Sequence, residues 1–304
     1  MALSTPQRSA EAAAAVLAGS ASAGRTRGER VFAVLLLGAT AVSVLVLGLL
    51  IAQVLLDGLA RLDLQFLTSY PSRRAARTGI RAGITGSLSL MVLTAAVAFP
   101  LGVAAAVYLE EFAPDNRFTR LLEANVANLA GVPSVVYGLL GSAVFVYLFQ
   151  MGRSLVAGAL TLALLILPVI IVASRESLRA VPQAIRHAGL ALGATPLQVA
   201  ARQTVPSALP GIFTGTILAL SRAVGETAPI LVVGAVLSRR SDNVPWGLLD
   251  AFTGLPIQIY DFVSRPQADF REGAASAAIL VLLTVLLLMN SVAIVLRNRY
   301  ARRW

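Results

Sequence analysis

Two residues of opposite charge stand four positions apart inside a long apolar stretch. Arg222 and Glu226 belong to the run S-R-A-V-G-E-T-A-P at residues 221–229. Positions i and i+4 share one face of a helix, so the two side chains can pair, and pairing lowers the cost of placing either charge in a membrane. A guanidinium remains charged and binds tetrahedral oxyanions as well as carboxylates. Two interpretations stay open: a gate on the path of an anionic substrate, or a static ion pair that positions its helix.

Residues next to the charged pair favour the first interpretation. Gly225 and Pro229 weaken a helix and allow it to bend. A second polar interruption, G-V-P-S-V-V-Y-G at residues 131–138, places a proline inside another apolar stretch. The carbonyl that this proline frees needs a partner, and a nearby hydroxyl can supply one or can line a polar path. The candidate substrate path or gate therefore consists of Arg222, Glu226, Thr227, Ser134 and Tyr137.

The composition indicates that these residues are carried by membrane-spanning helices. Hydrophobic residues make up 57% of the 304, charged residues 13%, and the mean hydropathy is +0.78. Crossing a bilayer takes about 20 apolar residues. We expect an all-α polytopic membrane protein with six transmembrane helices. They are placed at Val31–Leu56, Gly83–Leu109, Ala124–Phe149, Leu155–Ser174, Leu209–Leu237 and Ala274–Leu296.

Several classes of chemistry are excluded by the residues that the sequence lacks. It contains no cysteine and one histidine, which removes thiolate and zinc sites and a Ser-His-Asp triad. All 25 basic residues are arginine, so the chain has no Walker-type G-x-x-x-x-G-K motif. We therefore expect no catalytic site, metal or cofactor in this chain. The net charge of +10 lies in segments that flank apolar runs, which fits an acidic lipid surface better than nucleic acid.

The ends of the chain predict its orientation. Residues 1–30 are rich in Ala, Ser and Gly and are expected to be disordered. The apolar run 31–56 is too long for a signal peptide and is read as a retained first span. With the N-terminus inside, 14 arginines lie inside and 10 outside, and the basic tail 297–304 is typical of a stop-transfer signal. Both termini are predicted to be cytoplasmic.

Two segments between spans are expected to form short helices. On the outside, residues 253–260 predict a helix lying at the membrane surface, with Trp246 and Tyr260 at interfacial depth, or a docking site for an external protein. On the inside, residues 182–206 predict a compact helix–glycine–helix elbow. Its two helices begin at prolines, Thr195 caps the second one, and Gly193 breaks the chain between them.

The elbow resembles the EAA loop of ABC-importer permeases, the element that docks into a cytoplasmic ATPase. The family pattern is Glu-Ala-Ala, three residues, glycine, and a hydrophobic-proline ending. Ala188, Gly193 and Pro206 match it, whereas His187 replaces the glutamate and Gly189 the second alanine. The resemblance implies that the residues for ATPase coupling are Arg186, His187, Ala188, Gly189, Gly193 and Pro206.

Four segments together resemble the A-type permeases of bacterial phosphate-specific ABC importers: residues 131–138, the elbow, residues 220–229, and L-P-I-Q-I-Y at 255–260. The resemblance covers residues 79–299. It implies a multi-pass protein of the bacterial cytoplasmic membrane that carries inorganic phosphate inward. It also implies a C-type permease as heterodimer partner, two copies of an ATPase that bind ATP and Mg, and an external phosphate-binding protein.

Two other functions stay open beside phosphate import. A permease for sulfate or molybdate would share the elbow and could use an arginine as well. An ion-coupled secondary transporter would show inverted repeats and discontinuous spans, and no convincing internal repeat is present in this sequence.

Overall fold

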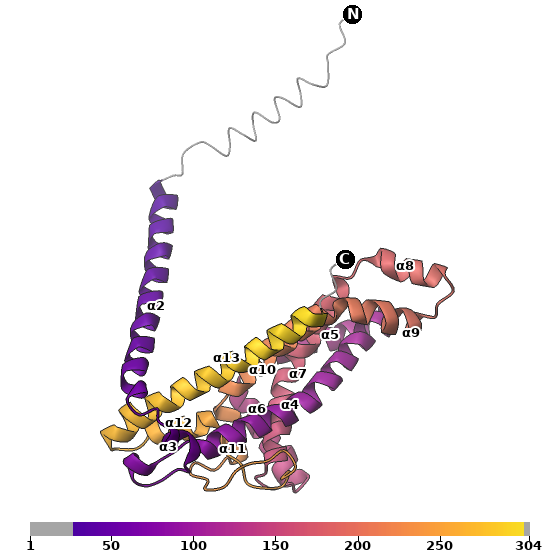
Figure 1. The fold of residues 1–304 in the computed structure, drawn as a ribbon. Coiled ribbons are helices and arrows are strands. Elements are labelled where there is room, and N and C mark those ends of the chain that lie inside the picture. Colours follow the sequence, from indigo (N-terminus) through magenta and orange to yellow (C-terminus); the bar gives the residue numbers. More distant parts are fainter. Residues whose placement is uncertain (1–26, 301–304) are drawn as a thin grey trace, which may run out of the picture. The chain divides into compact units, whose positions relative to one another are not determined.

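The computed structural model describes residues 27–300, and all regular structure in that range is helical (Figure 1). The chain divides into two compact units, residues 1–53 and 54–304. In the first unit, helix α2 (Arg27–Leu59) begins, and most of its apolar side chains from Val31 onward are exposed. Residues 1–26 of the predicted disordered segment, and residues 301–304 of the predicted basic tail, lie outside the described residues.

The second unit is a bundle of long helices joined by short ones, including five π-helical or 3-10 segments. After α2 the chain runs through α3 (Leu64–Thr68), η1 (Ala75–Arg77), α4 (Arg81–Val107), η2 (Tyr108–Phe112), α5 (Arg117–Leu129), α6 (Ser134–Gly141), η3 (Ser142–Leu148), α7 (Leu155–Arg179), α8 (Gln183–Ala191), α9 (Pro196–Val199), η4 (Ala200–Thr204), α10 (Val205–Gly225), α11 (Ala228–Val233), α12 (Leu255–Val263), η5 (Asp269–Ala274) and α13 (Ala275–Tyr300).

Five helices in the described part of the chain are long and apolar enough to cross a membrane, and a bent pair makes a sixth span if it is counted as one. The five are Val31–Leu59, Arg81–Phe112, Leu155–Arg179, Pro196–Gly225 and Asp269–Arg299. The prediction of an all-helical protein is confirmed, and the predicted six spans are reached when the bent pair is counted as one.

The third predicted span is not one straight helix. Between α5 and α6–η3 the chain bends by 105°, so the expectation of a continuous helix over residues 124–149 is wrong. Pro133 stands just before α6 and restricts the residue that precedes it to non-helical conformations. Helix α5 is amphipathic and mostly exposed. Its second half had been included in the predicted span because the apolar stretch was taken to begin at residue 124.

Helix α7 is the centre of the bundle. Two thirds of the most apolar part of α7 is buried. Helices α4, α10, α6 and α11 pack against α7. Small residues let α10 approach closely: a Cβ at Gly215 would lie 2.3 Å from the Cβ of Ala173, and one at Gly211 would lie 2.5 Å from the Oγ of Ser177. The spacing of these glycines, four positions apart, is therefore a helix-contact signal.

Helix α12 is buried in the bundle. Leu255, Ile257 and Phe262 are fully covered, and the helix packs against α4 and α13. The prediction of a helix at residues 253–260 is confirmed, but its surface position is wrong. Its polar residue Gln258 is completely buried as well, because neighbouring helices cover this segment.

Candidate functional site

The charged pair lies where the fifth span ends. Arg222 is in the last turn of α10, and Glu226 follows the final helical residue in an extended conformation, with φ −73° and ψ 118°. The Nε of Arg222 donates to Oε1 of Glu226 at 3.2 Å. The two side chains were expected to pair along one helix face. They do pair, but across the helix end, because Gly225 and Pro229 interrupt the helix that was predicted over 209–237.

The two side chains of this pair differ in exposure. The side chain of Arg222 is 47% exposed and that of Glu226 is 16% exposed. Among the described residues, Glu226 is the one hydrogen-bond partner that the structure gives Arg222. A guanidinium has five N–H donors, and the structure gives a protein partner to one of those of Arg222, the Nε–H.

The two polar interruptions predicted from the sequence meet in space. Helix α6 packs against α11, and a Cβ at Gly138 would lie 2.8 Å from the Cα of Pro229. The backbones of α6 and α11 are therefore in close contact at Gly138 and Pro229. The contact brings the start of α6, just after its bend, beside the short helix that follows Glu226.

The hydroxyls near this junction have different roles. Tyr137 is buried and donates its hydroxyl to the carbonyl of Leu129 at 2.8 Å, at the end of α5. It therefore satisfies a carbonyl at the bend, one of the two roles that its position suggested. Ser134 is half-buried at the first position of α6, and Thr227 is the residue before α11, with no side-chain bond to the helix end that it precedes.

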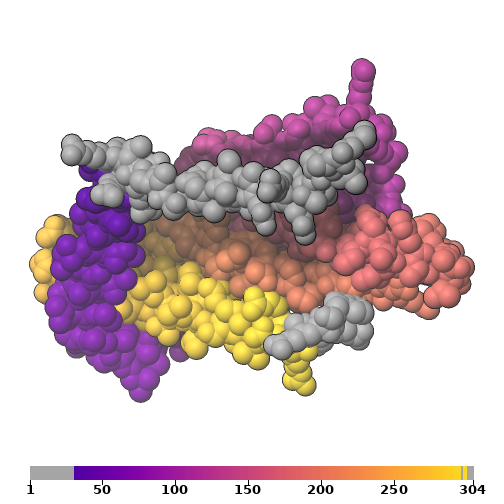
Figure 2. Space-filling view, turned by 90° about the horizontal axis from the view of Figure 1, so that it is seen from above, coloured from indigo at the N-terminus to yellow at the C-terminus, as the bar shows by residue number. Residues whose placement is uncertain are grey.

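The predicted elbow is present at one end of the bundle, where α8 and α9 project beyond their neighbours (Figure 2). Gly193 has a φ of +83°, a conformation that favours glycine, and it separates the two helices. Thr195 and Gln198 form a capping box at the start of α9. Pro206 does not end the elbow as expected. It lies in the first turn of α10, and the helix continues through it to Gly225.

The elbow residues face in different directions. His187, Ala188 and Gly193 are exposed, and a Cβ at Gly193 would meet open space. Gly189 is buried. A Cβ at this position would lie 2.8 Å from side-chain atoms of both Val199 and Gln203. Gly189 therefore lets α8 fold onto the segment that leads into α10.

Arg186 points inward and fastens α8 to the bundle. Its Nη2 donates to Glu111 at 2.7 Å and to the carbonyl of Leu178 at 2.9 Å, and its Nη1 donates to the carbonyl of Val181 at 3.3 Å. The Arg186 and Glu111 side chains are only 13% and 10% exposed. Arg186 was a candidate for ATPase coupling, and the structure places it as an anchor of the elbow.

More ion pairs join the helices at this end, and none of them was predicted from the sequence. Arg175 pairs with Glu123 at 2.6 Å and with Glu110 at 3.4 Å, and Arg179 pairs with Glu110 at 3.0 Å. The network connects η2, α5 and α7. The one available signal was the doublet Glu110-Glu111 at the end of an apolar span, where an acidic pair is unusual.

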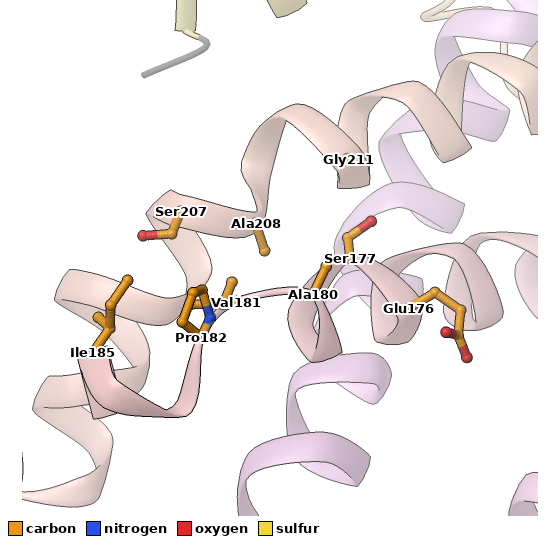
Figure 3. A pocket seen from close by; sticks show the side chains of 9 residues that line it. All are labelled: Glu176, Ser177, Ala180, Val181, Pro182, Ile185, Ser207, Ala208 and Gly211. Atoms are coloured by element: carbon orange, nitrogen blue, oxygen red, sulfur yellow. The ribbon is translucent and has the colours of Figure 1, made fainter. Parts of the chain in front are cut away.

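An apolar groove of about 480 Å³ opens at the base of the elbow (Figure 3). The end of α7, the turn into α8 and the first turns of α10 surround it. Its lining residues are Glu176, Ser177, Ala180, Val181, Pro182, Ile185, Ser207, Ala208 and Gly211. The groove thus lies where the elbow leaves the bundle, beside the small residues that let α7 and α10 approach.

Comparison with known proteins shows which family has this arrangement. Residues 98–303 match the family described as binding-protein-dependent transport system inner membrane component. A probable ABC transporter permease protein, YqgI of Bacillus subtilis, is 30% identical over 253 residues, which cover 80% of this chain and 86% of that protein. The phosphate transport system permease protein PstA 1 of Mycobacterium tuberculosis is 38% identical over 214 residues, 68% of each chain.

Two further matches extend the likeness. PstA of Haemophilus influenzae is 30% identical over 262 residues, 84% of this chain and 90% of that protein. Among solved structures, an inward-facing form of the MetNI methionine ABC transporter aligns with a TM-score of 0.58 at 17% identity. The alignment covers 73% of this chain and 96% of the other. At this identity the structural match shows a shared fold.

Proposed function

We propose that the chain, which belongs to the family of inner membrane components of binding-protein-dependent transport systems, is the permease subunit through which a bacterial importer carries inorganic phosphate. As an ABC importer permease it is a multi-pass protein of the inner membrane. The observation that carries the choice of phosphate is the 30–38% identity to phosphate permeases over most of the chain. The proposal includes a C-type permease as heterodimer partner, with ATP and Mg bound by a separate ATPase subunit.

Arg222 is the group that we assign to the anion. Phosphate at neutral pH carries between one and two negative charges, and a guanidinium binds its oxygens in a fixed geometry. Glu226 competes for the same guanidinium, which prevents tight retention of the ion. A site that an ion can leave quickly is what conduction requires.

The second helix of the elbow, α9, and Arg222 belong to one helical segment. Pro196–Gly225 forms a run of 30 helical residues, which corresponds to a length of about 45 Å. Movement of the ATPase against α8 and α9 is therefore transmitted along α10 to the break at Glu226. A tilt of α10 changes the contact between α11 and α6, and that contact is where we place the gate.

The substrate is tested in vesicles that contain the complete importer with its binding protein. ATP-driven uptake of radiolabelled phosphate is measured in the presence of excess sulfate or molybdate. We expect uptake to continue unchanged with either competitor. If sulfate or molybdate is carried in preference, the permease serves that oxyanion and phosphate import is refuted.

The role of Arg222 is tested with the double variant Arg222→Gln, Glu226→Gln, which removes both charges and leaves no unpaired ion. We expect the complex to assemble and to lose phosphate uptake. The control is Arg120→Gln with Asp115→Asn, which removes an exposed pair at 3.8 Å and should transport normally. Normal uptake by an assembled Arg222/Glu226 double variant would show that the pair is structural.

A further inference from the structure

One loop at the end of the bundle opposite the elbow carries an uncompensated positive charge. The loop between α3 and α4, residues 70–79, lies at that end (Figure 1). Arg73, Arg74 and Arg77 are exposed on it. In the part of the chain that the structure describes, none of the three side chains has an ion pair, a hydrogen bond or a ring contact. We call residues 70–79 the arginine loop.

Three neighbouring arginines at the same end do have acidic partners. Arg61 pairs with Asp63 at 3.3 Å, and Arg265 pairs with Asp261 at 2.6 Å. Arg81 is paired with Asp242. Acidic residues also line a recess beside Arg61, namely Asp57, Asp269 and Glu272, yet none of these pairs with the arginine loop. The three arginines on the loop, like the exposed Arg271 of η5, have no acidic partner among the described residues and are therefore available to a group outside the chain.

The arginine loop is held in a defined shape by hydrogen bonds to its backbone. Nη2 of Arg61 donates to the carbonyls of Ala75 and Thr78, at 2.9 and 3.2 Å. Nη1 of Arg265 donates to the carbonyl of Ser72 at 3.1 Å. The hydroxyl of Thr78 accepts from the backbone N–H of Ser72, which closes the loop on itself at 3.1 Å. Fixing the loop in advance reduces the entropy that a partner must remove on binding.

A fixed loop favours a shaped partner over a lipid surface. Acidic lipids attract basic side chains without requiring any geometry of the backbone. A folded protein gains from a preorganised patch, because complementary charges set its orientation and speed its association. The family to which the chain belongs works with a separate binding protein, and the elbow occupies the other end.

We propose that Arg73, Arg74 and Arg77 form the docking surface for an acidic face of the soluble binding protein. The proposal rests on the import function proposed above and is independent of which oxyanion is carried. The arginine loop is also connected to the helices of the bundle by hydrogen bonds. Arg265 joins the loop backbone to Asp261 of α12, so a force on the loop reaches a buried helix that packs on α4 and α13.

The test uses the assembled importer in nanodiscs and measures its affinity for the binding protein. The variant Arg73→Glu, Arg74→Glu, Arg77→Glu should bind at least about tenfold more weakly at low salt, because three attractive contacts become repulsive. The matched variant with lysine at the same three positions keeps the charge and should bind within about twofold of the parent. Arg117→Glu with Arg120→Glu, which reverses two exposed arginines on α5, should leave affinity unchanged.

Salt and lipid composition supply two independent readouts. For the parent complex, affinity should fall as ionic strength rises from ~0.05 M to ~0.5 M, over which screening increases several-fold. The affinity of the glutamate variant should change little over the same range of ionic strength.

The proposal is overturned if the assembled glutamate variant binds as tightly as the parent, or if the affinity of the parent does not depend on salt. If the glutamate variant loses affinity for the binding protein only in nanodiscs that contain acidic lipid, the loop binds the membrane, and this result also overturns the proposal. Failure of the parent complex to import phosphate would instead refute the proposed function, since docking is measured without transport.

Discussion

Replacing Glu111 by alanine should loosen the elbow. Glu111 accepts two hydrogen bonds from Arg186, at 2.7 and 3.2 Å, and both side chains are largely buried. The substitution leaves a buried guanidinium with two backbone carbonyls as partners, those of Leu178 and Val181.

The cost follows from what remains around Arg186. Breaking a buried ion pair by removing one partner typically costs about 3–5 kcal/mol. The two carbonyls stay in place and the site lies at a helix end, so we expect about 2 kcal/mol here. A loss of that size corresponds to a fall of about 4 °C in the midpoint of thermal unfolding for a chain of this length. The double variant Glu111→Met, Arg186→Met removes both charges and should recover part of the loss.

The assay is thermal unfolding of the assembled complex, followed by intrinsic fluorescence, with ATP hydrolysis and uptake measured on the same samples. Glu111→Ala should lower the midpoint and should raise the number of ATP molecules hydrolysed per phosphate imported, because a loosened α8 transmits less movement. The exposed residue Glu176 supplies the control, since Glu176→Ala removes a pair at 3.5 Å and should change the midpoint little.

A double-mutant cycle decides whether the reasoning holds. If Glu111 and Arg186 interact as the structure shows, the effects of the two single changes exceed that of the double change by about 2 kcal/mol. Strict additivity, or a Glu111→Ala complex as stable and as well coupled as the parent, would refute the anchoring role.

Four further predictions can be checked independently. A leucine at Gly138, whose Cβ would lie 2.8 Å from the backbone of Pro229, should push α6 off α11 and abolish uptake while the complex still assembles on size-exclusion chromatography. Gly193→Leu should reduce uptake at preserved assembly, because a φ of +83° strains any residue with a side chain; unchanged uptake would exclude the elbow as the coupling element. The hydrogen bond from Arg81 holds the pKa of the Asp242 carboxyl below its usual range, so the pair stabilises the fold above about pH 4 and that contribution is lost as pH falls further; thermal midpoints of Asp242→Asn should accordingly vary less with pH in this acid range. The purified chain alone should neither hydrolyse ATP nor move phosphate into vesicles, and transport driven by an ion gradient would contradict an ATP-driven role.

Local patterns in the sequence predicted much of this fold. Apolar runs of sufficient length located the spans, because crossing a bilayer imposes a minimum length whatever the packing. Gly193, Thr195 and Pro196 predicted the elbow, since a positive φ, a cap and a helix start are each decided by one or two residues. Arg222 and Glu226 predicted a pair because their separation is short.

Features that depend on distant residues could not be predicted in the same way. Pro133 was expected to free a carbonyl inside a continuous span, and the 105° bend between α5 and α6 was not predicted. The helix over residues 253–260 was expected at the membrane surface, whereas the helices around α12 cover it, including its polar residue Gln258. The partners of Glu110 and Glu111 lie on α7 and α8, more than sixty residues along the chain, and no local spacing connects them.

The continuity of Pro196–Gly225 also has a consequence for helical phase. Each residue of α10, the α-helix of this segment that carries Arg222, turns the chain by about 100°, so the direction in which Arg222 points relative to the elbow depends on the number of residues in α10. One added residue would rotate Arg222 away from its present direction by about 100°, whereas four would return it to within about 40°. The length of this segment is therefore more tightly constrained than its composition, and a substitution along it is easier to accommodate than an insertion or a deletion.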